Sequence, residues 1–112
     1  MYGEVILTDP KGEKRTVPMI ANAATLIRFK QLFHIDLLSE IINSEGNFDV
    51  DVVSKLAFIM AKQAAKADMK AINMDSYIEW LEEYDSMAFI NKIHDIVNIY
   101  SGSKENISEE KK

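Results

Sequence analysis

A single strand–turn–strand segment near the N-terminus constrains the fold most strongly. Tyr2–Leu7 and Glu13–Ile20 have the residue pattern of strands, and the sequence TDPKG between them supplies a turn. Pro18 lacks a backbone N–H donor, which confines the second strand to a sheet edge or ends it. Because two strands alone are marginally stable in water, the hairpin must pack on helices or join the sheet of a partner.

The remainder of the chain predicts helices. Apolar residues recur at helical spacing in segments separated by polar breaks, and the stretch from Ala21 to Ile42 reads as one short basic helix running into an apolar one. Helices are expected over Ala23–Phe33, Ile35–Ile42, Val50–Lys66, Ser76–Glu83 and Ser86–Tyr100. The second of these is expected to bury Leu37, Leu38, Ile41 and Ile42.

Capping residues mark the helix ends. Asn22 is the expected N-cap of the first helix, and either Asp49 or Asp51 caps the third. Asp75 is expected to cap the fourth helix, with Glu79 returning a reciprocal contact. Gly102 ends the last helix, and the polar sequence from residue 101 onward predicts disorder. The sequence therefore predicts a mainly α-helical α+β fold with an N-terminal β-hairpin and about five helices. The chain is expected to form a single globular domain over 1–100 and a disordered tail over 101–112.

Composition narrows the class of protein. The 112 residues are 47% hydrophobic, which suits one packed core, and they include no cysteine that could form disulfides or thiolate metal sites. No apolar run approaches the roughly 20 residues of a spanning helix, and the first residues lack the order of a signal peptide. The net charge of −5 disfavours nucleic-acid binding. We therefore expect a soluble cytoplasmic protein without nucleic-acid or membrane partners.

No motif indicates catalysis. The glycines are isolated, which excludes a glycine-rich phosphate loop, and neither His34 nor His94 has a histidine or carboxylate four residues away. We interpret His34 as the end of a helix and His94 as part of a half-buried helical face. The acidic residues near Glu82 fit a solvated face, and those near Asp49 fit a helix cap rather than a calcium loop. The prediction is a protein that is not an enzyme and that uses no cofactor, metal or small-molecule substrate.

Two features point to partner proteins instead. Trp80 is flanked by Tyr77 and Tyr84 at helical spacing, a pattern that fits either a core or a binding hot spot. The segment Ser86–Tyr100 is apolar on more than one face, so it must be covered on two sides. A central core position, a self-association surface and a groove for another protein all satisfy this requirement, and the sequence leaves the choice open.

Three segments resemble a known family. The sequences ANAATLIRFKQLFHIDLL, LAFIMAKQA and SYIEWLEEYD, within roughly Val17–Tyr84, are similar to the tail assembly chaperones of long-tailed phages and prophages of Gram-positive bacteria. Members of this family have a short strand pair followed by helices with these packing motifs. His34 stands where the family often has a small residue.

The resemblance implies a non-enzymatic function in phage tail morphogenesis. It implies that the chain binds tape measure protein and keeps it soluble while tail tube protein polymerises around it, and that it is absent from the mature virion. The contact candidates in this interpretation are Phe29, Leu32, Trp80, Ile90, Ile93 and Val97.

Two other hypotheses remain. A small regulatory DNA-binding module could be built on the two helices of Ile35–Lys66, although this region lacks a strongly basic second helix. An enzyme would need a pocket that gathers His34, Asp36 or His94, and the spacing of these residues predicts none.

Overall fold

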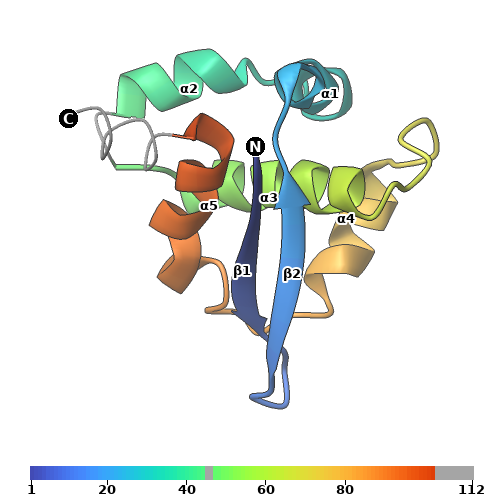
Figure 1. Cartoon of the computed structure of the whole chain (residues 1–112), viewed down its shortest axis with the longest axis vertical. Coiled ribbons are helices and arrows are strands. Elements are labelled where there is room, and N and C mark those ends of the chain that lie inside the picture. Colours follow the sequence, from blue (N-terminus) through green and yellow to red (C-terminus); the bar gives the residue numbers. More distant parts are fainter. Residues whose placement is uncertain (45–46, 103–112) are drawn as a thin grey trace.

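The computed structural model describes residues 1–44 and 47–102, with the side chains of residues 42–44 excepted (Figure 1). Its elements are β1 (Tyr2–Thr8), β2 (Lys14–Ile20), α1 (Ala23–Phe33), α2 (Leu37–Ser44), α3 (Val50–Ala64), α4 (Met74–Leu81), the 3₁₀ helix η1 (Ile90–Lys92) and α5 (Ile93–Ser101). The predicted α+β fold, an N-terminal hairpin followed by five α-helices in the described residues, is confirmed. Most of the predicted disordered tail, residues 103–112, lies outside the described residues.

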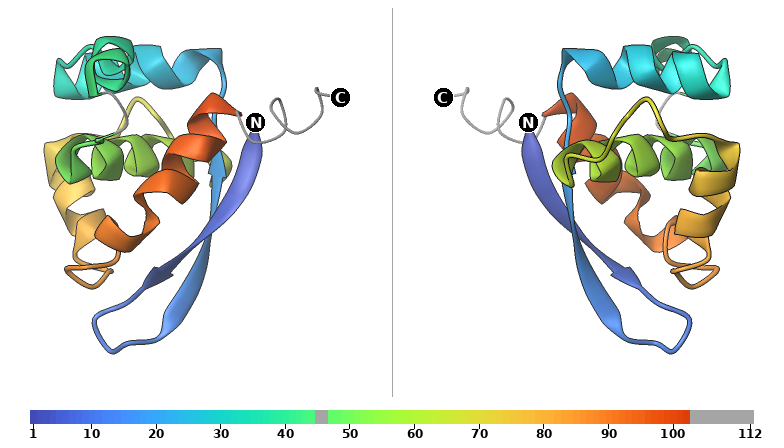
Figure 2. Two further views of the ribbon diagram at one scale, coloured as in Figure 1. Left: turned by 90° about the vertical axis from the view of Figure 1, so that its left-hand side faces the viewer. Right: turned by 90° about the vertical axis from the view of Figure 1, so that its right-hand side faces the viewer.

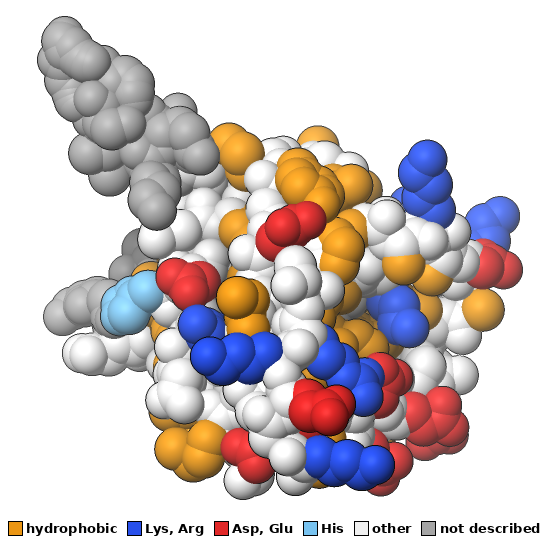
Figure 3. Space-filling model, turned by 60° about the horizontal axis from the view of Figure 1, so that its bottom comes forward, with side chains coloured by type: hydrophobic (Ala, Val, Ile, Leu, Met, Phe, Trp, Pro, Cys, Tyr) orange, Lys and Arg blue, Asp and Glu red, His pale blue; other side chains and the backbone are white. Residues whose placement is uncertain are grey.

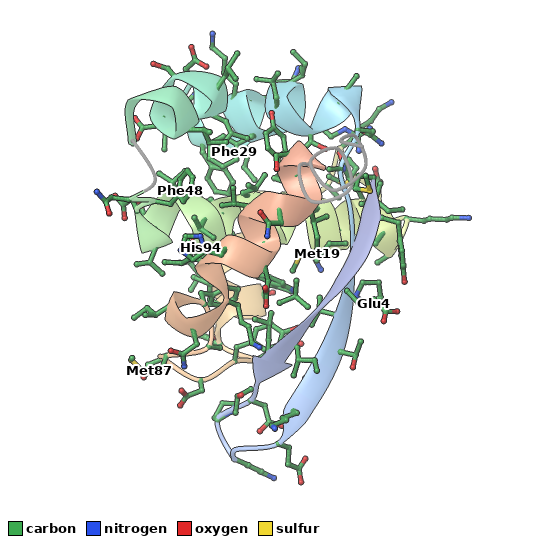
Figure 4. All side chains as sticks on the ribbon, turned by 60° about the vertical axis from the view of Figure 1, so that its left-hand side comes forward. Glu4, Met19, Phe29, Phe48, Met87 and His94 are labelled. Atoms are coloured by element: carbon green, nitrogen blue, oxygen red, sulfur yellow. The ribbon has the colours of Figure 1, made fainter. Side chains whose placement is uncertain are left out.

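The hairpin presents one apolar face to the helices. Its strands pair antiparallel with Val5 opposite Val17, and the inward side chains Val5, Leu7, Val17 and Met19 are buried. Figure 4 shows Met19 directed toward the helices and Glu4 directed away from them. Gly12 in the turn has a φ of 89°, a left-handed conformation that glycine adopts without strain. The alternation therefore places the hydrophobic face on the core side, as the sequence predicts.

The carboxylate of Asp9 organises this turn. It accepts hydrogen bonds from the backbone N–H groups of Lys11 and Glu13, each at 2.9 Å, and its Oδ2 lies 3.4 Å from Nε of Arg15. The pKa of Asp9 is lowered, chiefly by the hydrogen bond from Glu13, with further contributions from Lys11 and Arg15 that oppose the effect of burial. The turn therefore depends on an ionised carboxylate.

Helix α3 is the centre of the molecule. Buried side chains cover most of its circumference: Val53, Ser54, Leu56, Ala57, Phe58, Ile59, Met60, Ala61 and Gln63. One narrow stripe, made of Asp51, Lys55 and Lys62, is exposed or partly exposed. Figures 1 and 2 show α3 crossing the middle of the structure, with α1 and α2 over one side, the hairpin over another, and α4 and α5 over the rest. A helix with so wide an apolar surface requires cover on every side except that stripe.

Gln63 ties α3 to the junction between β2 and α1. Its Nε2 donates to the carbonyl of Ile20 at 2.7 Å and to Oγ1 of Thr25 at 2.9 Å. Thr25 Oγ1 also accepts from the N–H of Asn22, the predicted N-cap of α1, whose own side chain accepts from Ala24. One buried amide thus fixes the end of the sheet and the start of a helix against the same core helix.

Several predicted helix ends are confirmed. His34 ends α1 in a left-handed conformation with φ of 61°, and Gly102 ends α5 with φ of 62°. Asp49 is the N-cap of α3, since its carboxylate accepts from the N–H of Asp51 at 2.9 Å. Among the described residues, no helix has the length and apolar character needed to cross a bilayer.

Other predictions of local structure were wrong. Leu38 is half-exposed while its neighbour Leu37 is fully buried, because α2 covers α3 with one face only. The N-cap of α4 is Asn73 rather than Asp75, since Asn73 and Ser76 satisfy each other's backbone N–H groups, so Glu79 makes no reciprocal contact.

The last helix begins later than the sequence predicts. The N–H of Asp85 donates to the carbonyl of Thr8 at 2.7 Å, and the carboxylate of Asp85 accepts from the N–H of Met87 at 3.0 Å. These bonds hold the following residues in turns, so that regular α-helix starts only at Ile93. The end of the hairpin therefore sets the path of the chain before α5.

Replacing Gln63 tests the junction between β2 and α1. We expect Gln63→Leu to lower the free energy of unfolding by about 1–3 kcal/mol, because it removes the side-chain donor to the carbonyl of Ile20 and one of the two donors to Oγ1 of Thr25. Gln31→Leu, on the exposed face of α1, is the matched control and should change stability by about 0.5 kcal/mol or less. Urea denaturation followed by circular dichroism measures both. Equal effects would contradict the role assigned to Gln63.

The lowered pKa of Asp9 predicts a pH dependence of stability. A carboxyl group whose folded pKa lies below its ordinary value of 3.8 stabilises the fold above that value, and this contribution is lost as the pH falls through the folded pKa. Asp9→Asn should therefore be less stable than the wild type at neutral pH, and the difference should shrink in acid. Thermal unfolding at pH values from neutral down through this range measures it. A difference that is independent of pH would contradict the prediction.

Candidate functional site

A continuous row of aromatic rings crosses the core and ends at the surface. Successive ring centroids are 5.1 to 5.6 Å apart in the series Phe29, Phe33, Tyr77, Phe58, Trp80 and Phe89. Tyr84 packs on both of the last two rings, at 5.2 Å from Trp80 and 5.8 Å from Phe89. Aromatic pairs at such distances add stability beyond the area they bury. They give the surface above them a rigid floor.

A groove lies over this end of the aromatic row, between the start of α3, helix α4 and the segment that precedes η1. We call it the α4 groove. It encloses about 340 Å³, and its apolar lining is Val50, Tyr77, Leu81, Tyr84, Phe89 and Ile90. The polar lining includes the carboxylates Asp51 and Asp85. The groove is therefore apolar along its floor and acidic at its rim.

Exposed apolar side chains surround the α4 groove. Four of the large hydrophobic residues that are nearly half-exposed come from this region: Met74, Ile78, Met87 and Ile90. Met74 and Ile78 are one turn apart on α4, beside the face that buries Tyr77 and Trp80, so the apolar surface of this short helix is wider than its buried face. On the face shown in Figure 3, hydrophobic side chains reach the surface among charges of both signs. Exposed apolar groups rimmed by charges are typical of protein-binding surfaces.

The polar groups of the groove are held in place. The hydroxyls of Ser54 and Tyr77 lie 2.7 Å apart, and Ser54 also donates to the carbonyl of Asp51 at 3.0 Å. Asp51 pairs with Lys55 at 3.0 Å. Burial raises the pKa of both Tyr77 and Tyr84, so these hydroxyls stay protonated at neutral pH. None of these groups is arranged as an activated nucleophile or base.

The structure separates the contact candidates predicted from the sequence. Phe29, Trp80 and Val97 are buried in the core, with no exposed surface at all for Phe29. Leu32 and Ile93 are partly buried against the core, and Ile90 is 45% exposed in the lining of the α4 groove. In this conformation, Ile90 presents the most surface to a partner. Trp80 supports the groove from below through its contact with Phe89.

Sequence reasoning missed the outward face of α4. Tyr77, Trp80 and Tyr84 drew attention to this helix because of their aromatic character, but Met74 and Ile78 carry the exposed surface. The sequence contains this signal, since Met74 and Ile78 at i and i+4 extend the apolar surface of the helix beyond the face of Tyr77 and Trp80. From the sequence, the last helix is expected to be covered on two sides. In the structure, α3 is the helix that other elements cover on more than one side.

The two histidines stand apart from any catalytic or metal-binding arrangement. His34 is exposed at the end of α1, and His94 is exposed on α5 rather than half-buried, with its ring 6.4 Å from that of Phe48 (Figure 4). Within residues 1–44 and 47–102, no three histidine, aspartate or glutamate side chains gather as a metal site would require. The site that the geometry offers is the α4 groove.

Comparison of the chain with models of protein families, with curated proteins and with solved structures finds no match.

Trp80 is buried and Ile90 is nearly half-exposed, so substitutions at these two positions should differ in their effect on stability. Trp80→Ala should lower the free energy of unfolding by about 3–5 kcal/mol, because it removes a buried ring with aromatic contacts on three sides. Ile90→Asp should lower it by about 1 kcal/mol at most, since nearly half of that side chain is already in water. Urea denaturation of both variants measures the difference. A larger loss for Ile90→Asp would show that Ile90 belongs to the core.

Proposed function

We propose that this protein is a non-enzymatic tail assembly chaperone, which binds and solubilises tape measure protein during phage tail morphogenesis in the bacterial host cell. The sequence resemblance within Val17–Tyr84 supports the family. The observation that carries the proposal is the α4 groove, an exposed apolar surface with an acidic rim on a protein whose described residues gather no catalytic group. Recruitment of tail tube protein belongs to the same proposal.

The chemistry of the groove suits such a client. A long helical tape measure protein exposes apolar stripes until the tail tube covers them, and a groove accepts an amphipathic helix through apolar side chains spaced by one turn. Asp51 and Asp85 at the rim favour a helix with lysine or arginine beside its apolar stripe. We therefore expect the client segment to be amphipathic and basic.

The partial exposure of the groove also suits a temporary complex. Met74, Ile78, Met87 and Ile90 are each just over half-buried in the free protein, so a client gains only the remaining apolar area when it binds. A small additional burial gives an affinity that a polymerising tube could overcome. The rigid aromatic floor keeps the groove open without a partner, which avoids an ordering cost at the moment of binding.

The alternative of a regulatory DNA-binding module receives less support. In such a module, the second helix of Ile35–Lys66 would have to enter the major groove of DNA. That helix is α3, most of whose surface is buried by the rest of the chain, and its exposed stripe includes the acidic Asp51. The charge of −5 opposes DNA binding as well.

Co-expression tests the proposal. We expect tape measure protein encoded nearby to be insoluble alone and soluble with this chain, and size-exclusion chromatography with light scattering should give the stoichiometry of the complex. The double variant Ile78→Asp, Ile90→Asp should lose most of this solubilisation while it remains folded. Ile27→Asp is the matched control, because Ile27 is a similarly exposed isoleucine on α1 that lies outside the groove.

Two results would contradict this proposal. If tape measure protein stayed insoluble and the chain eluted alone, the chaperone function would be wrong. If Ile27→Asp and the groove variant lost solubilisation equally, the function could stand but the α4 groove would not be its site.

A further inference from the structure

The register of the hairpin determines which backbone groups of β1 are free. Met1 and Ala21 exchange two backbone hydrogen bonds, and the N–H of Asp9 donates to the carbonyl of Glu13. These pairs continue the register that places Tyr2 opposite Ile20. Because hydrogen-bonded and non-bonded pairs alternate in an antiparallel ladder, odd residues of β1 bond to β2. The N–H and C=O groups of even residues therefore point away from β2.

The edge of β2 is protected. Pro18 has no N–H to offer, and the outward carbonyl of Ile20 accepts from Gln63. Helix α3 crosses the inner face of the hairpin, where it packs on β2 (Figures 1 and 2). Proline on an edge strand is a common device that prevents a sheet edge from pairing.

The edge of β1 is open from Tyr2 to Ile6. The outward carbonyl of Thr8 accepts from Asp85, but within the described residues the outward backbone groups of Tyr2, Glu4 and Ile6 have no hydrogen-bond partner. Three successive donor and acceptor positions are thus available along one edge. The strand carries neither proline nor a bulge there, so nothing in its backbone blocks another strand.

A groove runs along this open edge. It encloses about 310 Å³ between the start of β1 and one side of α5, with Asp95 and Ile99 on the helix side. Helix α5 approaches β1 from the inner face, since an added Cβ at Gly3 would lie 2.7 Å from Cγ1 of Ile99. The helix therefore packs below the strand and leaves the outer edge accessible.

The charge of this groove is negative. Glu4 is exposed on the outer face of the hairpin, where its carboxylate accepts a hydrogen bond from the Tyr2 hydroxyl at 2.9 Å. Asp95 lies on the other side of the groove and is exposed. Its carboxylate is 3.9 Å from Nζ of Lys92, which is a long distance for an ion pair. On the same face as Glu4, the neighbouring side chains Tyr2 and Ile6 are apolar and about half-exposed. The edge therefore presents an apolar–acidic–apolar pattern.

We propose that the open edge of β1 binds an extended segment of a partner protein as a third strand, with a lysine or arginine opposite Glu4 and apolar residues opposite Tyr2 and Ile6. Backbone hydrogen bonds to the three free positions hold such a segment, and the alternating side chains select it. This surface is separate from the α4 groove, and the proposal does not rest on the proposed chaperone function.

A second copy of the chain fits this edge less well. In the twofold antiparallel arrangement that engages all three positions, Glu4 would lie opposite Glu4 of the other copy. Like charges directly opposite each other destabilise a strand pair. Each chain also carries a net charge of −5, which adds long-range repulsion between copies.

A peptide titration tests this inference. The probe is the blocked heptapeptide acetyl-TVTKTVT-amide, added to the ¹⁵N-labelled chain at millimolar concentration. We expect saturable chemical-shift changes and slower hydrogen exchange at the amides of Tyr2, Glu4 and Ile6. The matched peptide with glutamate in place of lysine should bind roughly three- to tenfold more weakly, because it places like charges opposite each other.

Two variants complete the test. Ile6→Pro removes an outward N–H that does not bond to β2, so the hairpin should keep its pairing. Pro18 has the same effect on the outer edge of β2. We expect Ile6→Pro to abolish peptide binding. Glu4→Lys changes only an exposed side chain, so it keeps the fold and should reverse the preference to the glutamate peptide. Equal binding of both peptides, no protection at Tyr2 and Ile6, or concentration-dependent self-association through this edge would each overturn the proposal.

Discussion

The burial of most of the surface of α3 is the constraint on which the rest of the structure depends. Nine of its fifteen residues are buried, and only the stripe of Asp51, Lys55 and Lys62 faces water, so this helix needs cover on nearly every side. The hairpin is too small to be stable alone. It covers one side of α3, and this contact buries its own apolar face. Helices α1, α2, α4 and α5 cover the other buried sides (Figure 1). Gln63 adds a directional link, since its amide fixes the end of β2 and the start of α1 at one point.

Local chemistry determines the parts of this fold that the sequence predicts well. The hairpin follows from its turn and alternation, and Asn22, Asp49 and Gly102 act where capping rules place them. The α4 groove could not be predicted because it depends on long-range contacts. Its shape requires the hydrogen bond from Asp85 to Thr8, residues far apart in the sequence, and this bond delays the start of α5. Sequence periodicity likewise could not identify which of two apolar helices would be central.

The two candidate binding surfaces differ in kind. The α4 groove is apolar with an acidic rim and suits a helix, whereas the edge of β1 offers backbone hydrogen bonds and suits an extended segment. Both favour a positively charged partner, in keeping with the acidic chain. A protein with two such surfaces could hold a helical client and a second protein at once. The proposed link between tape measure protein and tail tube protein would require this capacity.

The most direct measurement is hydrogen exchange by mass spectrometry of the chain alone and in complex with tape measure protein. We expect new protection over residues 74–90, where the α4 groove lies, and unchanged slow exchange in α3. That result would mean that the client docks on a folded protein whose core stays closed. Faster exchange in α3 on binding would contradict the account, because it would mean that the core opens and that buried residues such as Phe29 contact the client.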